Sequence, residues 1–310
     1  YCQQLWTVYG YWLVNERSCM KVWSRADVLV LLLCLLAGMP AQAKLFGPDN
    51  EPWAFWQVSD AASATVIDHS EWQALLDSYL VTATPDGIFR FNYAAVTASD
   101  RQRLVRYIDE LTALDPRALN RAEQRAYWIN LYNALTVEVV LRHYPVKSIK
   151  QIQGGLFDSG PWDEPYIDIA GVPLTLNDIE HRILRPQWRD PRIHYALNCA
   201  SLGCPNLAVQ AYTAANTELL LELNAVAFIN SPRGVTVVNR RVTASSIYDW
   251  FADDFGPDEG ALLEHWLRYA APELAAGLGS NPDVLRIKYR YDWALNAEIA
   301  VTDSASGFAF

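Results

Sequence analysis

Cysteine and clustered positive charge are both scarce in this chain. Five of the 310 residues are cysteine, and three of these, Cys2, Cys19 and Cys34, lie among the first 43 residues. The formal net charge is −10, and no stretch gathers lysine and arginine. Because nucleic acids are bound largely through their phosphates, which such a surface repels, we expect no nucleic-acid partner.

Several catalytic signatures are also lacking. The sequence has no serine nucleophile elbow, no phosphate-binding loop and no paired-glycine dinucleotide fingerprint. We therefore expect no bound cofactor. After residue 43 no apolar run approaches the roughly 20 residues that cross a bilayer, so the mature chain is expected to have no transmembrane segment.

The first 43 residues have the pattern of an export signal. Met20 and Lys21 begin a short basic region, residues 28–36 are apolar, and residues 41–43 (Ala-Gln-Ala) suit a signal peptidase. We interpret residues 20–43 as a signal peptide and residues 1–19 as upstream reading frame without a structural role. The predicted location is periplasmic or secreted.

The remaining sequence predicts an α+β fold, mostly helical, in one domain. Residues 44–69 are predicted to form an N-terminal arm whose Trp53 and Trp56 dock on the body, and residues 70–300 the domain itself. Apolar periodicity places a long central helix at 121–143 and hairpins at 166–174 and 235–242, which together give a small, largely antiparallel sheet. A helix ending at residue 229 is expected to turn residues 219, 220, 223, 226 and 227 inward.

A polar stripe runs along the predicted central helix. Glu123, Asn130 and Asn133 recur at helical spacing on an otherwise apolar element. Buried asparagines cost stability unless they are hydrogen-bonded, so the stripe must meet polar groups elsewhere. Two interpretations are open: the side chains tie down the backbone of a loop, or they line a functional site.

Residues 192–205 hold the last two cysteines. Read as a strand, residues 193–199 place His194 and Cys199 on opposite faces, and the chain then turns so that Pro205 begins a helix. At such a helix start Cys204 would be favoured as a thiolate. The alternative is a Cys199–Cys204 disulfide, which an exported chain permits.

Four stretches resemble a family catalogued as domain of unknown function 547, found in bacteria and plants. They are AYWINLYNAL (126–135), LTLNDIEHRILR (174–185), DPRIHYALNCASLGCP (190–205) and YRYDWALN (289–296). The resemblance implies that the family's motif positions are Asn130, Tyr132, Asn133, Glu180, His181, His194, Cys199, Cys204 and Asp292. It implies no reaction.

Two classes of function follow. A thiol-dependent hydrolase or acyltransferase would use Cys204 as nucleophile, His194 or His181 as base, and Asp292, Asn198 or Asn130 to orient the imidazole. The other class is a non-catalytic envelope binding or assembly protein, with a disulfide at the same loop. Exposed tryptophans, for which we expect Trp162, Trp53 and Trp56, would then recognise a peptide, glycan or small molecule.

The same region contains residues of the types that bind metal ions. The candidate ligands are Glu180, His181, His194, Cys199 and Cys204, but their spacing matches no zinc motif, and we expect no metal. Glu180 and Cys199 are instead expected to line the site together with the polar stripe.

Overall fold

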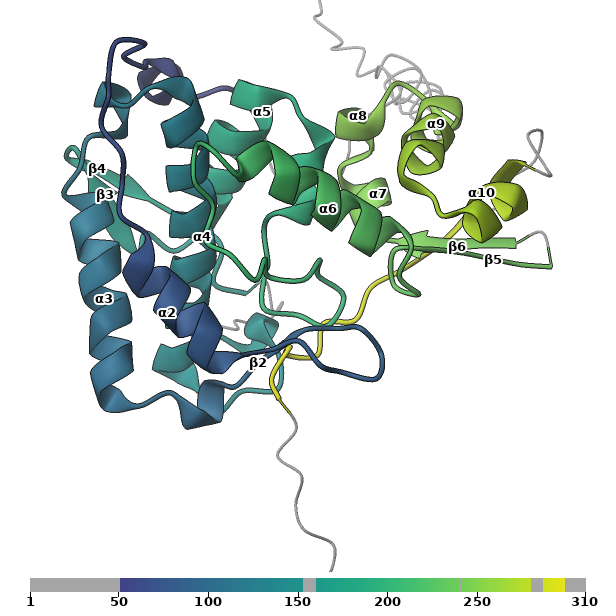
Figure 1. The fold of residues 1–310 in the computed structure, drawn as a ribbon, viewed down its shortest axis with the longest axis horizontal. Coiled ribbons are helices and arrows are strands. Elements are labelled where there is room, and N and C mark those ends of the chain that lie inside the picture. Colours follow the sequence, from purple (N-terminus) through teal and green to yellow (C-terminus); the bar gives the residue numbers. More distant parts are fainter. Residues whose placement is uncertain (1–50, 153–159, 240, 280–286, 299–310) are drawn as a thin grey trace, which may run out of the picture. The chain divides into compact units, whose positions relative to one another are not determined.

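The chain is organised around one long buried helix, α4 (Arg121–His143). The computed structural model describes residues 51–152, 160–239, 241–279 and 287–298. Asn120 caps α4 by accepting a hydrogen bond from the Glu123 amide, and residues 123–140 are buried. Since the helix has no wide polar face, other elements surround it, as Figure 1 shows. Its bounds are those that the sequence predicts.

The N-terminal half packs along α4. Trp56, in the short helix η1 (Ala54–Gln57), is 1% exposed and meets the Trp128 ring edge-on, so it docks on the body. The prediction that it is an exposed recognition ring is therefore wrong. Helices α2 (Ser70–Tyr79) and α3 (Ala98–Thr112) follow. Short elements connect them to α4: β1 (Leu80–Val81), β2 (Arg90–Phe91), η2 (Tyr93–Ala95) and η3 (Pro116–Ala118). The predicted signal peptide lies outside the described residues.

The middle of the chain supplies the segments around the site. After η4 (Ile149–Gln151) comes a hairpin of β3 (Ile167–Ile169) and β4 (Val172–Leu174), whose turn residues Ala170 and Gly171 have φ of 53° and 76°. Such positive φ values at both turn residues match the twist of the paired strands. The chain continues into the π-helix η5 (Asp178–Leu184), then α5 (Arg185–Trp188) and η6 (Pro191–Tyr195).

The C-terminal part combines a three-stranded sheet with short helices. The order is α6 (Thr217–Ile229), β5 (Val235–Val238), β6 (Arg241–Ser245), α7 (Ile247–Trp250), α8 (Ala252–Phe255), α9 (Glu259–Tyr269), α10 (Pro272–Gly279) and β7 (Ile287–Arg290). Strand β6 pairs antiparallel with β5 and parallel with β7. In Figure 1 these elements, drawn green to yellow, lie on the side of α4 away from α3.

The inward face of α6 differs from the prediction. Leu219, Leu223 and Val226 are 61%, 53% and 42% exposed. Ala227 is exposed as well, so Leu220 is the one predicted residue that is buried. The face that turns inward carries it together with Leu221, Ala225 and Phe228. Apolar residues lie nearly all round α6, so periodicity alone does not fix which face packs. In the observed orientation Glu218 and Glu222 form ion pairs with Arg125 of α4 and Arg192 of η6.

The hydrophobic core has two parts. The larger surrounds α4, and the smaller lies among α6, β5, β6 and α9, with Tyr195 packed in it. The mostly helical α+β class is therefore confirmed, although the described strands are divided among three small sheets. Within the residues described, no helix has both the length and the apolar character needed to span a membrane.

Candidate functional site

The cysteine stretch is a helical turn followed by a loop, so the predicted strand is wrong. Pro191 begins η6, and Asp190 caps it by accepting a hydrogen bond from the Arg192 amide. Proline is suited to this first position, where its missing N–H costs nothing. The predicted helix after Cys204 is also absent, since residues 205–216 contain no helix and α6 begins at Thr217.

The Asn198 side chain holds the cysteine loop together through two hydrogen bonds to its backbone. Its side-chain oxygen accepts from the Ala200 amide at 2.8 Å, and its amide donates to the Pro205 carbonyl at 2.7 Å. Ala200 has a φ of 59°, a conformation that costs most residues about 1–2 kcal/mol. The Asn198 side chain thus joins both ends of the loop and helps to hold this strained backbone in place.

The two sulfur atoms of the loop are bonded to each other. Cys199 and Cys204 form a disulfide with their Cα atoms 6.2 Å apart. The Tyr291 hydroxyl lies 3.0 Å from the Cys199 sulfur and 3.1 Å from that of Cys204, and the Cys199 amide donates to the Cys204 sulfur at 2.9 Å. Cys204 is 3% exposed, whereas Cys199 is partly exposed. In this form of the protein Cys204 is not a free thiol.

The two predicted catalytic histidines belong to a buried ring of charged side chains. His194 places Nε2 2.7 Å from the Asp254 carboxylate, and Arg185 donates from Nε to the same oxygen at 2.6 Å. Arg185 also meets His181 Nδ1 at 3.0 Å. The Glu180 carboxylate completes the ring, 3.8 Å from His194 Nδ1 and 3.9 Å from His181 Nδ1. The imidazoles are therefore held by carboxylates and a guanidinium.

Protonation inside the ring follows from burial. Burial lowers the pKa of His181 to about 4, so its ring is neutral near pH 7 and Nδ1 accepts the Arg185 proton. Burial alone would raise the pKa of Asp254, but hydrogen bonds from His194 and Arg185 outweigh it and lower the pKa well below its usual range. Asp254 is thus a fixed negative charge beside His194.

The polar stripe of α4 bonds loop backbone, as the first interpretation of the sequence proposed. Asn133 donates to the Ala196 carbonyl and accepts from the Asn198 amide, both at 2.9 Å. Asn130 makes the equivalent pair with the backbone of Tyr212, at 2.7 and 3.0 Å. Glu123 accepts from the Ile67 amide at 2.7 Å. The three side chains therefore position the cysteine loop, the 207–216 segment and the N-terminal arm.

Asp292 shapes a turn beside the disulfide. Its side chain is exposed and accepts from the Ala294 amide at 2.9 Å, while its carbonyl accepts from the Gly203 amide at 2.8 Å. A Cβ atom at Gly203 would lie 2.8 Å from the Asp292 nitrogen, so only glycine permits this approach. The cysteine loop thereby packs against residues 291–296.

Beside residues 291–296 lies a cluster of aromatic rings that we call the aromatic platform: Trp162, Trp250, Tyr291 and Trp293. Tyr291 lies 4.8 Å from Trp250 and 4.6 Å from Trp293 between ring centroids. The Trp250 and Trp293 rings are stacked at 5.6 Å and 25°, and Trp162 meets Trp293 edge-on at 5.5 Å. All four residues are partly exposed, although burial raises the pKa of the Tyr291 hydroxyl. The Lys150 ammonium lies 5.3 Å from the Trp293 ring centre.

Sequence reasoning found only part of this surface. It proposed Trp162 as an exposed ring, and Gly160, with φ of 85°, leaves room for it, because a Cβ there would lie 2.0 Å from the indole. The sequence analysis did not identify Trp250, Arg185 or Asp254 as site residues. For Trp250 the sequence signal was weak, since one tryptophan among twelve does not reveal its neighbours.

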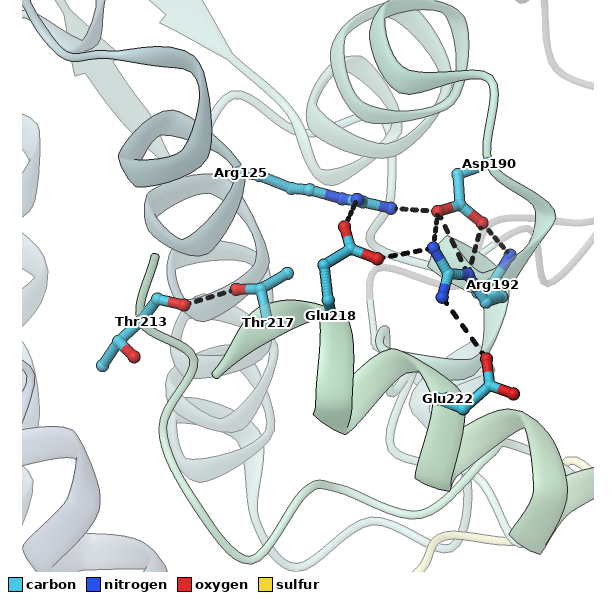
Figure 2. Close-up of polar contacts among 7 residues, drawn as sticks. All are labelled: Arg125, Asp190, Arg192, Thr213, Thr217, Glu218 and Glu222. Atoms are coloured by element: carbon cyan, nitrogen blue, oxygen red, sulfur yellow. Dashed lines mark hydrogen bonds and ion pairs between the residues drawn. The ribbon is translucent and has the colours of Figure 1, made fainter. Parts of the chain in front are cut away.

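A second group of charges holds η6 against α4 and α6 (Figure 2). Asp190 forms ion pairs with Arg125 at 2.5 Å and Arg192 at 2.7 Å, and Glu218 bridges the same two arginines. Burial raises the pKa of Asp190, but the bonds from Arg192 and Arg125 outweigh it and bring the pKa to about 2. This network keeps His194 and the cysteine loop in register with α4.

A cleft of about 340 Å³ lies beside the charged ring. Its lining residues are Pro52, Arg185, Pro186, Arg189, Asp190, Asp253 and Asp254. Among the described residues, no three or more histidine, cysteine, aspartate or glutamate side chains are grouped so as to hold a metal ion.

The comparisons with known proteins identify one domain. Residues 116–229 match the model of a family described as a protein of unknown function, DUF547, and this segment runs from η3 through the cysteine loop to the end of α6. No curated protein and no solved structure matches the chain. Residues 116–229, which hold the polar stripe, the charged ring's histidines and the disulfide, are therefore a DUF547 domain.

Proposed function

We propose that this protein is a non-catalytic binding protein of an oxidising, extracytoplasmic compartment, and that its aromatic platform binds a saccharide. The observation that carries the proposal is the platform itself, a set of mutually contacting, partly exposed rings. Large aromatic side chains are usually placed where their area is buried, so a cluster left partly exposed favours a binding surface.

A saccharide suits the platform better than a peptide does. The stacked Trp250 and Trp293 rings offer flat apolar faces for the C–H faces of sugar rings. Asp249 and Asp292, each next to a platform residue in the chain, are exposed carboxylates that can accept hydrogen bonds from sugar hydroxyls. Lys150 adds a donor at the edge, over the Trp293 ring.

The disulfide supports both the location and the binding role. Disulfides persist in oxidising compartments such as the periplasm and the cell exterior, in agreement with the predicted signal peptide. The bonded sulfurs also hold the loop against which Tyr291 packs. The charged ring then has a structural role, since its members are bonded to one another.

The test is a calorimetric titration of the oxidised protein with the β-linked hexamer of N-acetylglucosamine. We expect saturable binding that the variant Trp293→Ala weakens at least tenfold. Trp188→Ala is the matched control, because Trp188 is also partly exposed but contacts Arg121 away from the platform. Absence of binding, equal effects of the two variants, or binding of a proline-rich decapeptide in place of the sugar would contradict the proposal.

A thiol-dependent hydrolase or acyltransferase is the second candidate, and one observation favours it. The Cys204 sulfur faces two donors, the Cys199 amide and the Tyr291 hydroxyl, which would stabilise a thiolate after reduction. His194 or His181 would then serve as base, oriented by the Asp254 or Glu180 carboxylate beside it. The predicted orienting groups Asn198, Asn130 and Asp292 bond backbone instead. Hydrolysis of a p-nitrophenyl ester by the reduced protein, abolished by Cys204→Ser, would establish it over the binding role.

A further inference from the structure

We propose that the Cys199–Cys204 disulfide is a redox-active site that takes two electrons from a dithiol, and that its state controls the geometry of the aromatic platform. The redox step is independent of what the platform binds. Its control of binding rests on the function proposed above, so the experiment below reads the redox step and the rings without any saccharide.

The two sulfurs differ in access, and this assigns their roles. Cys199 is partly exposed, while Cys204 is 3% exposed. An incoming thiolate therefore attacks the Cys199 sulfur. A bond forms between the reductant sulfur and Cys199, the Cys199–Cys204 bond breaks, and its electron pair leaves on the Cys204 sulfur.

The loop is built to stabilise that leaving sulfur. The Cys199 amide donates to the Cys204 sulfur at 2.9 Å, and the Tyr291 hydroxyl lies 3.1 Å from it. Ser201 donates its hydroxyl proton to the Tyr291 oxygen at 2.9 Å, which leaves the Tyr291 proton free to point at sulfur. Hydrogen bonds to an anionic acceptor are the strong ones, and a stabilised thiolate is a better leaving group.

The second step completes the reduction and releases the oxidised reductant. The other thiolate of the reductant attacks its own sulfur in the mixed disulfide, and Cys199 leaves as a thiolate. The reductant becomes a cyclic disulfide and loses two protons. Cys199 takes up one of them, the other goes to the solvent, and Cys204 stays a thiolate. The protein gains two electrons and one proton, and no other co-reactant is needed.

Tyr291 couples this chemistry to the rings. Its hydroxyl lies 3.0 Å from one sulfur and 3.1 Å from the other, so it contacts both partners of the bond. When the bond breaks, van der Waals repulsion separates the two sulfur atoms and negative charge develops on Cys204, so the contacts of the hydroxyl must change. The Tyr291 ring contacts Trp250 and Trp293, and its displacement therefore moves the platform.

The experiment equilibrates the folded protein, without denaturant, in mixtures of reduced and oxidised dithiothreitol. Reduced cysteines are trapped by alkylation and counted by mass, and tryptophan emission is recorded in parallel. We expect reduction of the native protein with a shift in emission at the same midpoint. The Tyr291→Phe variant should be roughly tenfold harder to reduce, because one hydrogen bond to the leaving thiolate is lost.

Tyr289→Phe is the matched control, since Tyr289 lies in β7 two residues away and its midpoint should equal that of the wild type. The Cys199→Ser/Cys204→Ser double variant should show no emission change with dithiothreitol. Reduction that occurs only after unfolding, or equal midpoints for Tyr291→Phe and the wild type, would overturn the redox site. Reduction without an emission shift would overturn the coupling to the rings.

Discussion

Replacing Asn133 with alanine should destabilise the protein strongly although Asn133 touches no sulfur and no platform ring. The side chain is 2% exposed and satisfies two buried backbone groups, the Ala196 carbonyl and the Asn198 amide. Leaving a buried polar group unpaired costs about 1–3 kcal/mol. Two such groups lower the free energy of unfolding by about 2–6 kcal/mol, which is a large part of the total for most domains.

Urea unfolding of the oxidised protein, followed by far-ultraviolet circular dichroism, measures this loss. Gln102→Ala is the control, because Gln102 is exposed in α3 and its replacement should change the free energy of unfolding by no more than about 0.5 kcal/mol. If Asn133→Ala lowers the free energy of unfolding as little as the control does, the polar stripe does not hold the cysteine loop, and α4 does not position the site.

Three further predictions concern the charged groups and the disulfide. Burial lowers the pKa of His181 from 6.5 to about 4, as it does for His69 and His265, so urea unfolding should show stability falling from pH 6.5 to pH 4 by up to about 3 kcal/mol for each of the three; a flat profile argues against neutral buried rings. Asp190→Asn removes the carboxylate that Arg125 and Arg192 share and leaves the buried Arg125 with the exposed Glu218 as its acidic partner, so it should cost about 3 kcal/mol in the same assay, against at most about 1 for Glu222→Gln at the exposed end; equal losses would contradict the network. The Cys199→Ser/Cys204→Ser double variant should lose about 2 kcal/mol, the chain-entropy value for so short a loop, and an unchanged unfolding midpoint would speak against this estimate.

Sequence patterns predicted the elements whose local signals are strong. The α4 helix has an asparagine cap and uninterrupted helical periodicity, and the hairpin at 167–174 has a turn that suits positive φ, so both were found at or near their observed bounds. The prediction of a strand before Cys199 failed because alternation of apolar and polar residues over so few positions cannot distinguish a strand from a helical turn. There the Asp-Pro pair at 190–191 was the stronger signal.

The site was harder to predict because its partners are distant in sequence. Asp254 lies 60 residues from His194, and Tyr291 lies 87 residues from Cys204, so only the tertiary fold brings each pair together. The inward face of α6 was predicted wrongly for a related reason. Apolar residues lie nearly all round the helix, so periodicity left its rotation ambiguous, and its packing partners come from distant segments.

The most direct measurement of the central claim is the response of individual indole N–H signals to saccharide. In nuclear magnetic resonance spectra of ¹⁵N-tryptophan-labelled oxidised protein titrated with the N-acetylglucosamine hexamer, the signals of Trp162, Trp250 and Trp293 should shift together and saturate. Those of the buried Trp56 and of Trp188 should stay in place. Unchanged platform signals, or shifts confined to Trp188, would contradict the account.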